Sequence, residues 1–301
     1  MHLNSADIFI VFIFMALTFV LGLRAGIRTK SLREYAIADK TYSTPILFMT
    51  LTATIVGAAG TIGTVASIYQ YGIIFAVATL SYVISFFFVS KYIVPKFDER
   101  FEGMLSAGDI LAKFYGRSVE KFSASIVCAF SIAILIAQMI ALAHIMHFVT
   151  GIEYIQALLI FGVILISYSG LGGIKAVVRT DVLQFLMMLI ALPTLAFFAT
   201  NQAGGFYKMV NTVVDLDANK FEIFGHSAFN QHLIMFALYL FPMYLGPNLI
   251  QRFLMSNNKE SIRRMMYGYV FIYLCILLCC ALIAFAAITL IKSGSPKEII
   301  P

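Results

Sequence analysis

Long uncharged apolar runs dominate the chain. The hydrocarbon core of a bilayer is about 30 Å thick, so a helix of roughly 20 apolar residues crosses it. Eight runs approach or exceed this length, and each is predicted to form a transmembrane helix. They cover residues 8–23, 45–69, 73–90, 122–150, 154–169, 182–200, 232–250 and 265–291.

The composition agrees with this pattern. Hydrophobic residues make up 61% of the 301 residues and charged residues 12%, against about 25% charged in an ordinary soluble domain. So few charges cannot cover a water-exposed surface of this size. The composition therefore indicates an all-α polytopic membrane protein and excludes a disordered chain, a secreted disulfide scaffold and a nucleic-acid-binding protein.

The basic residues are distributed unevenly between the two sets of alternate loops. All but four of the 21 Lys and Arg residues fall in one set, which includes Arg24, Lys96 and Arg252. Cytoplasmic loops are enriched in Lys and Arg, so both termini are predicted to lie outside. The four residues assigned to the outer side are Lys208, Lys220, Lys292 and Lys297. The net charge of +6 thus reflects topology rather than an acidic partner.

The polar chemistry available inside the spans is limited. The acidic residues lie in loops or at span ends, so a proton relay built on mid-membrane carboxylates is not expected. No nucleophile–base pair stands out, and the four Cys residues have no metal spacing, so an enzyme is not expected. His144 and His147 could share a metal if Glu153 folded back; helix packing or hydrogen bonding at the outer interface is the alternative.

The second span is unusually rich in glycine and threonine. Residues 50–64 contain three Gly and five Thr. Glycine is a poor helix former, and threonine can bond its own backbone, so this span can unwind at low cost. A bound cation could then satisfy the freed carbonyls. Close packing through small residues is the other interpretation.

The seventh span is also interrupted. Pro242, Gly246 and Pro247 lie within a few residues of one another, and a straight helix containing them would lose backbone hydrogen bonds. Interrupted helices at corresponding positions of two repeats are a strong sequence indication of a transporter binding site. The two broken spans together therefore favour a transporter.

A glycine-rich segment follows the fifth span. The sequence GLGG begins at Gly170, but no strand precedes it and no GK[ST] follows it, so a nucleotide-binding loop is not supported. Thr180 and Asp181 are instead predicted to be the N-cap and a first-turn acid of the sixth span.

Several polar or aromatic side chains are expected within or near the ends of spans. Gln138 lies in the middle of the fourth span and must face protein or a cavity; hydrogen bonding between helices and lining of a site are both open. For tyrosines near span ends, an aromatic-belt position at the membrane interface is expected. They are Tyr154, Tyr168, Tyr267, Tyr269 and Tyr273.

Four segments resemble the sodium/solute symporters, the family of proline, choline, pantothenate, iodide and sugar carriers. They are SLREYAIADK at residues 31–40, residues 50–72 around the broken second span, GLGGIKAVVRTDVLQ at residues 170–184, and YLGPNLIQRFL from Tyr244 onward. The first resembles the entry to the first core helix, and the third resembles the family signature. The segments occur in the family's order from about residue 5 to residue 291.

The resemblance implies a five-plus-five inverted-repeat fold preceded by one extra helix. Residues 1–301 would form a single transmembrane transporter domain. Within it, residues 8–23 would be the extra helix, residues 45–200 the first five-helix repeat, and residues 232–291 the first two helices of an incomplete second repeat.

The resemblance also implies two binding sites. Backbone carbonyls of Ala53 and Val56 would bind sodium beside the first break. A small organic solute would lie near both breaks, and Tyr82 and Gln138 are weaker candidates for contacting it. The implied solute-binding residues are Gly57, Thr61, Tyr82, Gln138, Tyr244, Gly246 and Asn248.

Three features differ from parts of the family. Family sodium sites are completed by two hydroxyls on the eighth core helix, whereas this sequence ends just after core helix seven. Thr54 and Ile55 stand where some members carry an acid, so a proline-type site is not expected. The chain also has no Trp, which some members that carry cationic substrates use for stacking.

We therefore expect sodium-coupled symport of a small organic solute across the cytoplasmic membrane, with sodium as the coupling ion and no cofactor. The alternatives are a truncated or split symporter that needs a separate chain for its remaining helices, and a symporter-like sensor module.

Overall fold

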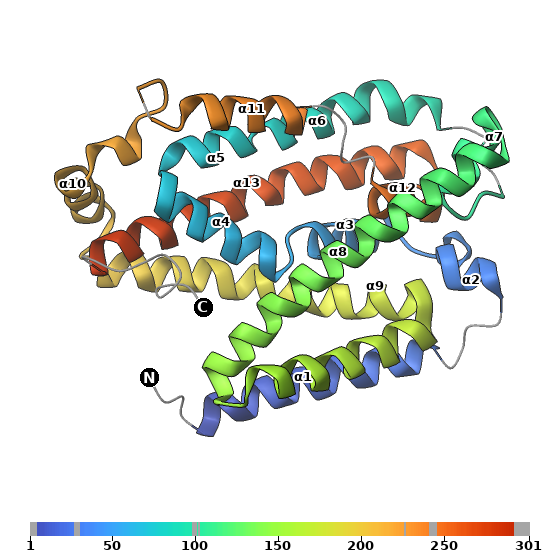
Figure 1. Cartoon of the computed structure of the whole chain (residues 1–301), viewed down its shortest axis with the longest axis horizontal. Coiled ribbons are helices and arrows are strands. Elements are labelled where there is room, and N and C mark those ends of the chain that lie inside the picture. The colour runs from blue at the N-terminus through green and yellow to red at the C-terminus, as the bar shows by residue number, and fades with distance from the viewer. Residues whose placement is uncertain are drawn as a thin grey trace. The chain divides into compact units, whose positions relative to one another are not determined.

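The computed structural model describes residues 5–26, 31–97, 101, 103–225, 227–240 and 246–291. Within these residues every regular element is helical (Figure 1). The elements up to residue 96 are α1 (Ser5–Gly26), α2 (Leu32–Ile37), η1 (Ala38–Lys40), α3 (Thr44–Ile55), α4 (Ala58–Tyr71), α5 (Ile73–Thr79), α6 (Ser81–Phe88), η2 (Val89–Ile93) and η3 (Val94–Lys96). The later elements are α7 (Ala107–Tyr115), α8 (Arg117–Thr150), α9 (Tyr154–Gln202), α10 (Phe206–Leu216), η5 (Ala218–Phe221), α11 (Phe229–Leu240), α12 (Pro247–Met255) and α13 (Lys259–Leu290).

Among the described residues, each of the eight predicted spans contains helix, and the second is broken at Val56–Gly57. Four helical stretches are long and apolar enough to cross a membrane: Ile73–Lys96, Arg117–Thr150, Ser169–Gln202 and Lys259–Leu290. The pair Thr44–Ile55 and Gly60–Tyr71 qualifies as a fifth when taken as one broken span. The predictions for residues 8–23 and 154–169 correspond to shorter apolar helices at Phe9–Ala25 and Tyr154–Ser167.

The chain forms two compact units, and both predicted breaks mark boundaries between them. Unit 1 contains residues 1–54, 97–184 and 246–262, and unit 2 contains residues 55–96, 185–245 and 263–301. Helices α3, α9 and α13 each contribute residues to both units.

The core of unit 1 forms where α1, α8 and the first part of α9 meet (Figure 1). Ala143 and Met146 of α8 are buried against Ala157 and Phe161 of α9, and Val11 of α1 packs on this cluster. Small residues allow close approach of helices, which is the usual basis of helix association in membranes. At the other end of unit 1, α12 packs on α2, η1 and α7.

In unit 2, α11 packs along α5 and α6 (Figure 1). The segment η5 closes over the α4–α5 turn, where the Lys220 ammonium donates a hydrogen bond to the Gln70 carbonyl at 2.6 Å. Burial lowers the pKa of Lys220, and the carboxylate of Asp217, 3.9 Å away, acts in the opposite direction. A residue assigned from the sequence to an outer loop is therefore half-buried and holds two segments of unit 2 together.

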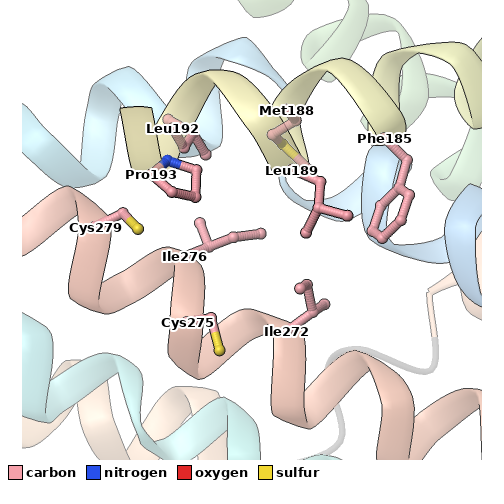
Figure 2. A pocket seen from close by; sticks show the side chains of 9 residues that line it. All are labelled: Phe185, Met188, Leu189, Leu192, Pro193, Ile272, Cys275, Ile276 and Cys279. Atoms are coloured by element: carbon pink, nitrogen blue, oxygen red, sulfur yellow. The ribbon is translucent and has the colours of Figure 1, made fainter. Parts of the chain in front are cut away.

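The residues of α9 and α13 that belong to unit 2 face each other around Pro193 (Figure 2). A proline inside a helix cannot donate its backbone hydrogen bond, and its ring crowds the carbonyl four residues earlier, here that of Leu189. An apolar gap of about 30 Å³ remains beside this turn, next to Ile276 and Cys279 of α13. The thiols act here as small apolar groups.

The segment after the fifth span is helical, which corrects the prediction that Thr180 caps the sixth span. The backbone departs from helical geometry at Gly173 (φ 54°, ψ −150°), and helix continues beyond it. Thr180 therefore lies well inside this helix, and its hydroxyl donates to the Val177 carbonyl at 2.9 Å. Asp181 is buried rather than solvated in a first turn.

Gly72→Ala is expected to destabilise unit 2. Gly72 has φ of +80°, and an added Cβ would lie 2.2 Å from the carbonyl oxygen of Lys220. Backbone strain and this overlap together should cost at least about 2 kcal/mol. Thermal unfolding in detergent should show a lower midpoint than for the wild type.

Gly63→Ala is the matched control in the neighbouring helix α4, because nothing lies within 4 Å of its added Cβ. If the thermal unfolding midpoint of Gly72→Ala equalled that of Gly63→Ala, the packing of η5 on the α4–α5 turn would be contradicted.

Candidate functional site

The first helix break lies at Val56 and Gly57, between α3 and α4. Gly57 adopts φ −49° and ψ 178°, and its carbonyl accepts hydrogen bonds from the amides of Gly60 (2.8 Å) and Thr61 (3.0 Å). The last four carbonyls of a helix have no partner within the helix, and Ala53 belongs to this last turn of α3. The predicted break is thus confirmed, and it places carbonyls at a helix end that attracts cations.

The second break separates α11 from α12. Helix α11 ends at Leu240, and Gly246, with φ −58° and ψ 160°, is the N-cap of α12. Pro247 occupies the first turn, where the missing amide costs no hydrogen bond. The predicted residue Tyr244 lies outside the residues that the structure describes.

A cavity of about 170 Å³ in unit 2 adjoins the first break. One wall is a group of tyrosines, in which Tyr82 of α6 stacks on Tyr239 of α11 with ring centroids 4.4 Å apart. Tyr273 of α13 meets Tyr82 edge-on at 5.9 Å. The lining residues are Ile55, Val56, Gly60, Thr64, Phe75, Thr79, Tyr82, Tyr239, Tyr269, Tyr273, Ile276, Leu277 and Cys280.

The chemistry of this cavity suits a small organic molecule. Its described lining residues include aromatic faces and hydroxyl groups but no Asp, Glu, Lys or Arg. Small-molecule sites are typically apolar, with a few placed polar groups that orient the ligand. The start of α4 lies at the edge of the cavity, where helix N-termini favour negatively charged groups.

The structure gathers some of the predicted site residues in unit 2. Val56 and Tyr82 line the cavity, and Gly57 and Thr61 form the turn that begins α4 beside it. The Thr61 carbonyl also lies 4.0 Å from the Cys280 thiol of α13.

Other predicted residues belong to unit 1 and line no part of the tyrosine cavity. Gly246 caps α12, Asn248 follows it and lines a different cavity, and Ala53 is buried in α3. Gln138 is half-buried in the middle of α8.

The structure corrects the aromatic-belt prediction for two tyrosines. Tyr269 is 1% exposed and stacks on Phe86 at 4.5 Å, and Tyr273 stacks on Tyr269 at 5.8 Å. These positions lie four residues apart on the face of α13 that meets α6, because i and i+4 share one side of a helix. Tyr267, on another face, is 39% exposed.

A second cavity, of about 420 Å³, lies in unit 1 beside a buried ion pair. An Nη atom of Arg252 is 3.5 Å from a carboxylate oxygen of Asp181, and the same Nη donates to the Thr54 hydroxyl at 2.7 Å. The Thr50 hydroxyl donates to the Asp181 carboxylate. Helices α3, α9 and α12 thus meet at the Arg252–Asp181 ion pair. From the sequence, Arg252 was expected in a cytoplasmic loop and Asp181 in the first turn of the sixth span.

The sequence contained an indication that Arg252 and Asp181 matter, but composition alone could not show that their charges are buried. Arg252 and Asp181 both lie inside the segments that carry the family resemblance, yet a charge near a span end looks the same whether it is solvated or buried. A buried charge needs a partner and further hydrogen bonds. The threonines at positions 50 and 54, one helical turn apart, provide them.

The two histidines considered for a metal have other contacts. Nδ1 of His147 lies 2.7 Å from the Ile152 carbonyl, and His144 packs on Tyr154 with ring centroids 4.8 Å apart. Across the described part of the chain, no group of three or more His, Cys, Asp or Glu residues is arranged to hold a metal ion.

Thr50→Val is expected to destabilise unit 1 by about 1–3 kcal/mol. The substitution keeps the shape of the side chain but removes a hydrogen bond to the buried carboxylate of Asp181. Thermal unfolding in detergent should show a lower midpoint.

Thr52→Val is the matched control. Thr52 is equally buried in α3, but its hydroxyl donates to the Phe48 carbonyl one turn earlier in the same helix, at 2.9 Å. If Thr50→Val and Thr52→Val lowered the unfolding midpoint equally, the hydrogen bond from Thr50 to the Asp181 carboxylate would make no particular contribution to stability.

The fold is similar to that of a solved transporter. The chain is similar to a Na⁺-coupled sialic acid symporter, solved in a substrate-bound outward-open state, with a TM-score of 0.82 and 16% identity. The match covers 96% of this chain and 61% of that protein. At this identity the likeness establishes a shared fold.

Three relatives named as sodium-coupled transporters are similar in sequence. Sodium-coupled monocarboxylate transporter 2 of Mus musculus is 29% identical over 58% of this chain and 28% of its own length. The sodium/pantothenate symporter of Escherichia coli is 29% identical over 62% and 39%, and sodium-coupled monocarboxylate transporter 1 of Xenopus laevis is 23% identical over 90% and 44%. The matched region therefore spans less than half the length of each of these relatives.

The sequence profile of the sodium:solute symporter family matches residues 35–300. This range includes both helix breaks, the tyrosine cavity and the buried ion pair. It confirms the resemblance inferred from the four sequence segments, and it assigns the chain to a family of transporters rather than enzymes. The chain is a multi-pass membrane protein that belongs to the sodium:solute symporter family.

Proposed function

We propose that the chain forms the transmembrane part of a sodium-coupled secondary transporter that moves a small organic solute across the cytoplasmic membrane. The observation that carries the proposal is the helix break at Val56 and Gly57, which borders a tyrosine-lined cavity. Within a membrane, helices are interrupted where the freed backbone amides and carbonyls contribute to a binding site. Family membership and the activities of the named relatives support the same function.

The solute would lie against the tyrosines and the start of α4. Tyr82 would provide an aromatic face and a hydroxyl, and Gly57 and Thr61 would provide the turn beside the solute. The relatives carry monocarboxylates, pantothenate or sialic acid by name, which supports a small organic solute. The family resemblance also proposes Tyr244, Gly246, Asn248 and Gln138 as solute-binding residues.

Sodium would bind at the C-terminal end of α3. The proposed ligands are the backbone carbonyls of Ala53 and Val56, which flank the end of this helix. A monovalent cation there would satisfy carbonyls that lack helical partners and would be favoured by the helix dipole. Each positive charge that moves into a negative interior releases about 2.3 kcal/mol of free energy per 100 mV of membrane potential. Because this energy drives uptake, no cofactor is required.

The proposed orientation places the N-terminus outside, because the segments rich in Lys and Arg would then face the cytoplasm.

Uptake of labelled solutes into proteoliposomes tests the function. With an inward sodium gradient and a negative interior, at least one of a panel of monocarboxylates, vitamins and sugars should accumulate. Replacing sodium by choline should abolish the accumulation. Accumulation of no solute by correctly inserted protein would overturn the proposal.

Tyr82→Ala is expected to lower sodium-dependent uptake about tenfold at low solute concentration. The substitution removes the stack on Tyr239 and one wall of the cavity, and an aromatic pair contributes up to about 1.5 kcal/mol. Tyr82→Phe keeps the stack and tests the hydroxyl alone.

Tyr92→Ala is the matched control, because Tyr92 is 50% exposed and packs on Phe88 outside the cavity. Unchanged uptake by Tyr82→Ala, or an equal loss by Tyr92→Ala, would remove Tyr82 from the solute site.

A further inference from the structure

The short helix α2 is held against α9 at the point where the α9 backbone leaves helical geometry. The Lys175 ammonium donates to the Glu34 carboxylate at 2.7 Å, and the two side chains are 20% and 23% exposed. The Tyr35 hydroxyl donates to the Gly170 carbonyl at 3.1 Å. A Cβ added at Gly173 would lie 2.5 Å from Cδ2 of Tyr35. The absence of a side chain at Gly173 therefore lets α2 approach this turn of α9 closely.

The same short helix is also held against α12. The Gln251 amide of α12 donates to the Ala36 carbonyl at 2.8 Å, and Ile37 at the end of α2 is 1% exposed. Helix α12 packs on both α2 and η1. Since α12 begins at the second helix break, α2 joins the segment after that break to the part of α9 that belongs to unit 1.

The turn that follows α2 is strained. Ala38, Asp39 and Lys40 have φ angles of 52°, 50° and 58°. Left-handed backbone is unfavourable for a residue with a Cβ, and non-glycine residues normally adopt it singly rather than in runs. Among the described residues, these three are the non-glycine positions with positive φ. Such strain persists only where surrounding contacts impose it, and it is frequent in segments that switch between conformations.

We propose that α2 and η1, residues 32–40, form a releasable clasp between α9 and α12. When the contacts of Glu34 and Tyr35 break, Ala38–Lys40 can leave the left-handed region, and α12 is freed from α9. The strain opposes the contacts, so release costs less free energy than the contacts alone would require. The cavity of about 420 Å³ lies beside the clasp and is lined by Tyr35 of α2 and Asn248 of α12. This cavity gives the side chains space in which to move.

The clasp has a direction on the proposed orientation of the chain. Helix α2 follows a segment rich in basic residues that would face the cytoplasm, so its release would open unit 1 toward the cytoplasm. A role of the clasp in delivering the solute to the cytoplasm rests on the proposed function. The release of α2 from α9 and α12 does not rest on it.

Hydrogen exchange of the detergent-solubilised full chain, read by mass spectrometry in peptides that cover residues 31–41, tests the clasp. The Ala38 amide donates to the Glu34 carbonyl, and the Thr41 amide donates to the Ala38 carbonyl at 3.2 Å. Both amides become exchangeable when the segment opens, so the exchange rate reports the population of the released state. A peptide that covers residues 154–166 of α9 is the internal reference, and it should stay protected while residues 31–41 exchange.

Lys175→Gln is expected to raise the exchange rate of residues 31–41 about threefold to tenfold, because the charge-assisted hydrogen bond to Glu34 is lost. Arg179→Gln is the matched control, since Arg179 is an exposed arginine one turn later on α9. Its exchange rate should equal that of the wild type. Exchange of the reference peptide should be unchanged in both variants.

Lys40→Gly changes the strain and leaves the contacts of Glu34 and Tyr35 in place. Glycine adopts positive φ without the Cβ penalty, so the closed clasp should gain stability. The exchange rate, corrected for the intrinsic rate of each sequence, should fall about threefold to tenfold. Lys40→Gln removes the same charge but keeps a Cβ, and its rate should equal that of the wild type. An unstrained turn would instead exchange faster with glycine, because glycine adds freedom to the released chain.

Three results would overturn the clasp. The first is exchange of residues 31–41 that is no faster in Lys175→Gln than in Arg179→Gln. The second is exchange in Lys40→Gly that is as fast as in Lys40→Gln. The third is simultaneous loss of protection in residues 31–41 and in the α9 reference peptide, because the opening would then be global unfolding.

The exchange assay contains neither sodium nor solute, so it and the uptake assay can fail independently. The expected exchange rates in a chain that accumulates no solute would overturn the proposed function and leave the clasp standing. Sodium-dependent uptake together with unchanged exchange in Lys175→Gln would do the reverse.

Discussion

Every backbone amide and carbonyl inside a bilayer needs a partner, and this requirement governs the organisation of the chain. Continuous helix satisfies it, which is why the described regular elements are all helical. The chain departs from continuous helix at Val56–Gly57 and again before Pro247. Each departure is tolerable only if other groups take over the hydrogen bonds. The breaks are therefore the places where an ion or a solute can contribute to the structure itself.

Two of the boundaries between the two units also fall at the breaks. Residues up to Thr54 and from Gly246 to Ile262 belong to unit 1, whereas α4 and α11 belong to unit 2. Each unit has its own polar or aromatic centre. In unit 1, Arg252 and Asp181 join three helices through charge and threonine hydroxyls. In unit 2, Tyr82 and its neighbours form an aromatic wall.

Sequence reasoning succeeded where the physical cause is local. The helical spans follow from apolar length, and the breaks follow from glycine, threonine and proline at particular positions. It failed where the cause is packing. Thr180 has the chemistry of an N-cap, but the helix continues from Gly173, so its hydroxyl bonds the preceding turn instead. Tyr269 resembles an interfacial tyrosine until Phe86 stacks on it.

The sequence by itself determined the membrane class, the helical spans, the two interruptions and the family resemblance, because these depend on composition and order along the chain. Only the tertiary structure decided that Arg252 is buried against Asp181, 71 residues earlier, and that Tyr82 faces Tyr239. The physical reason is that burial depends on which face of a helix meets another helix. An arginine near a span end has the same local sequence whether water or a buried carboxylate surrounds it.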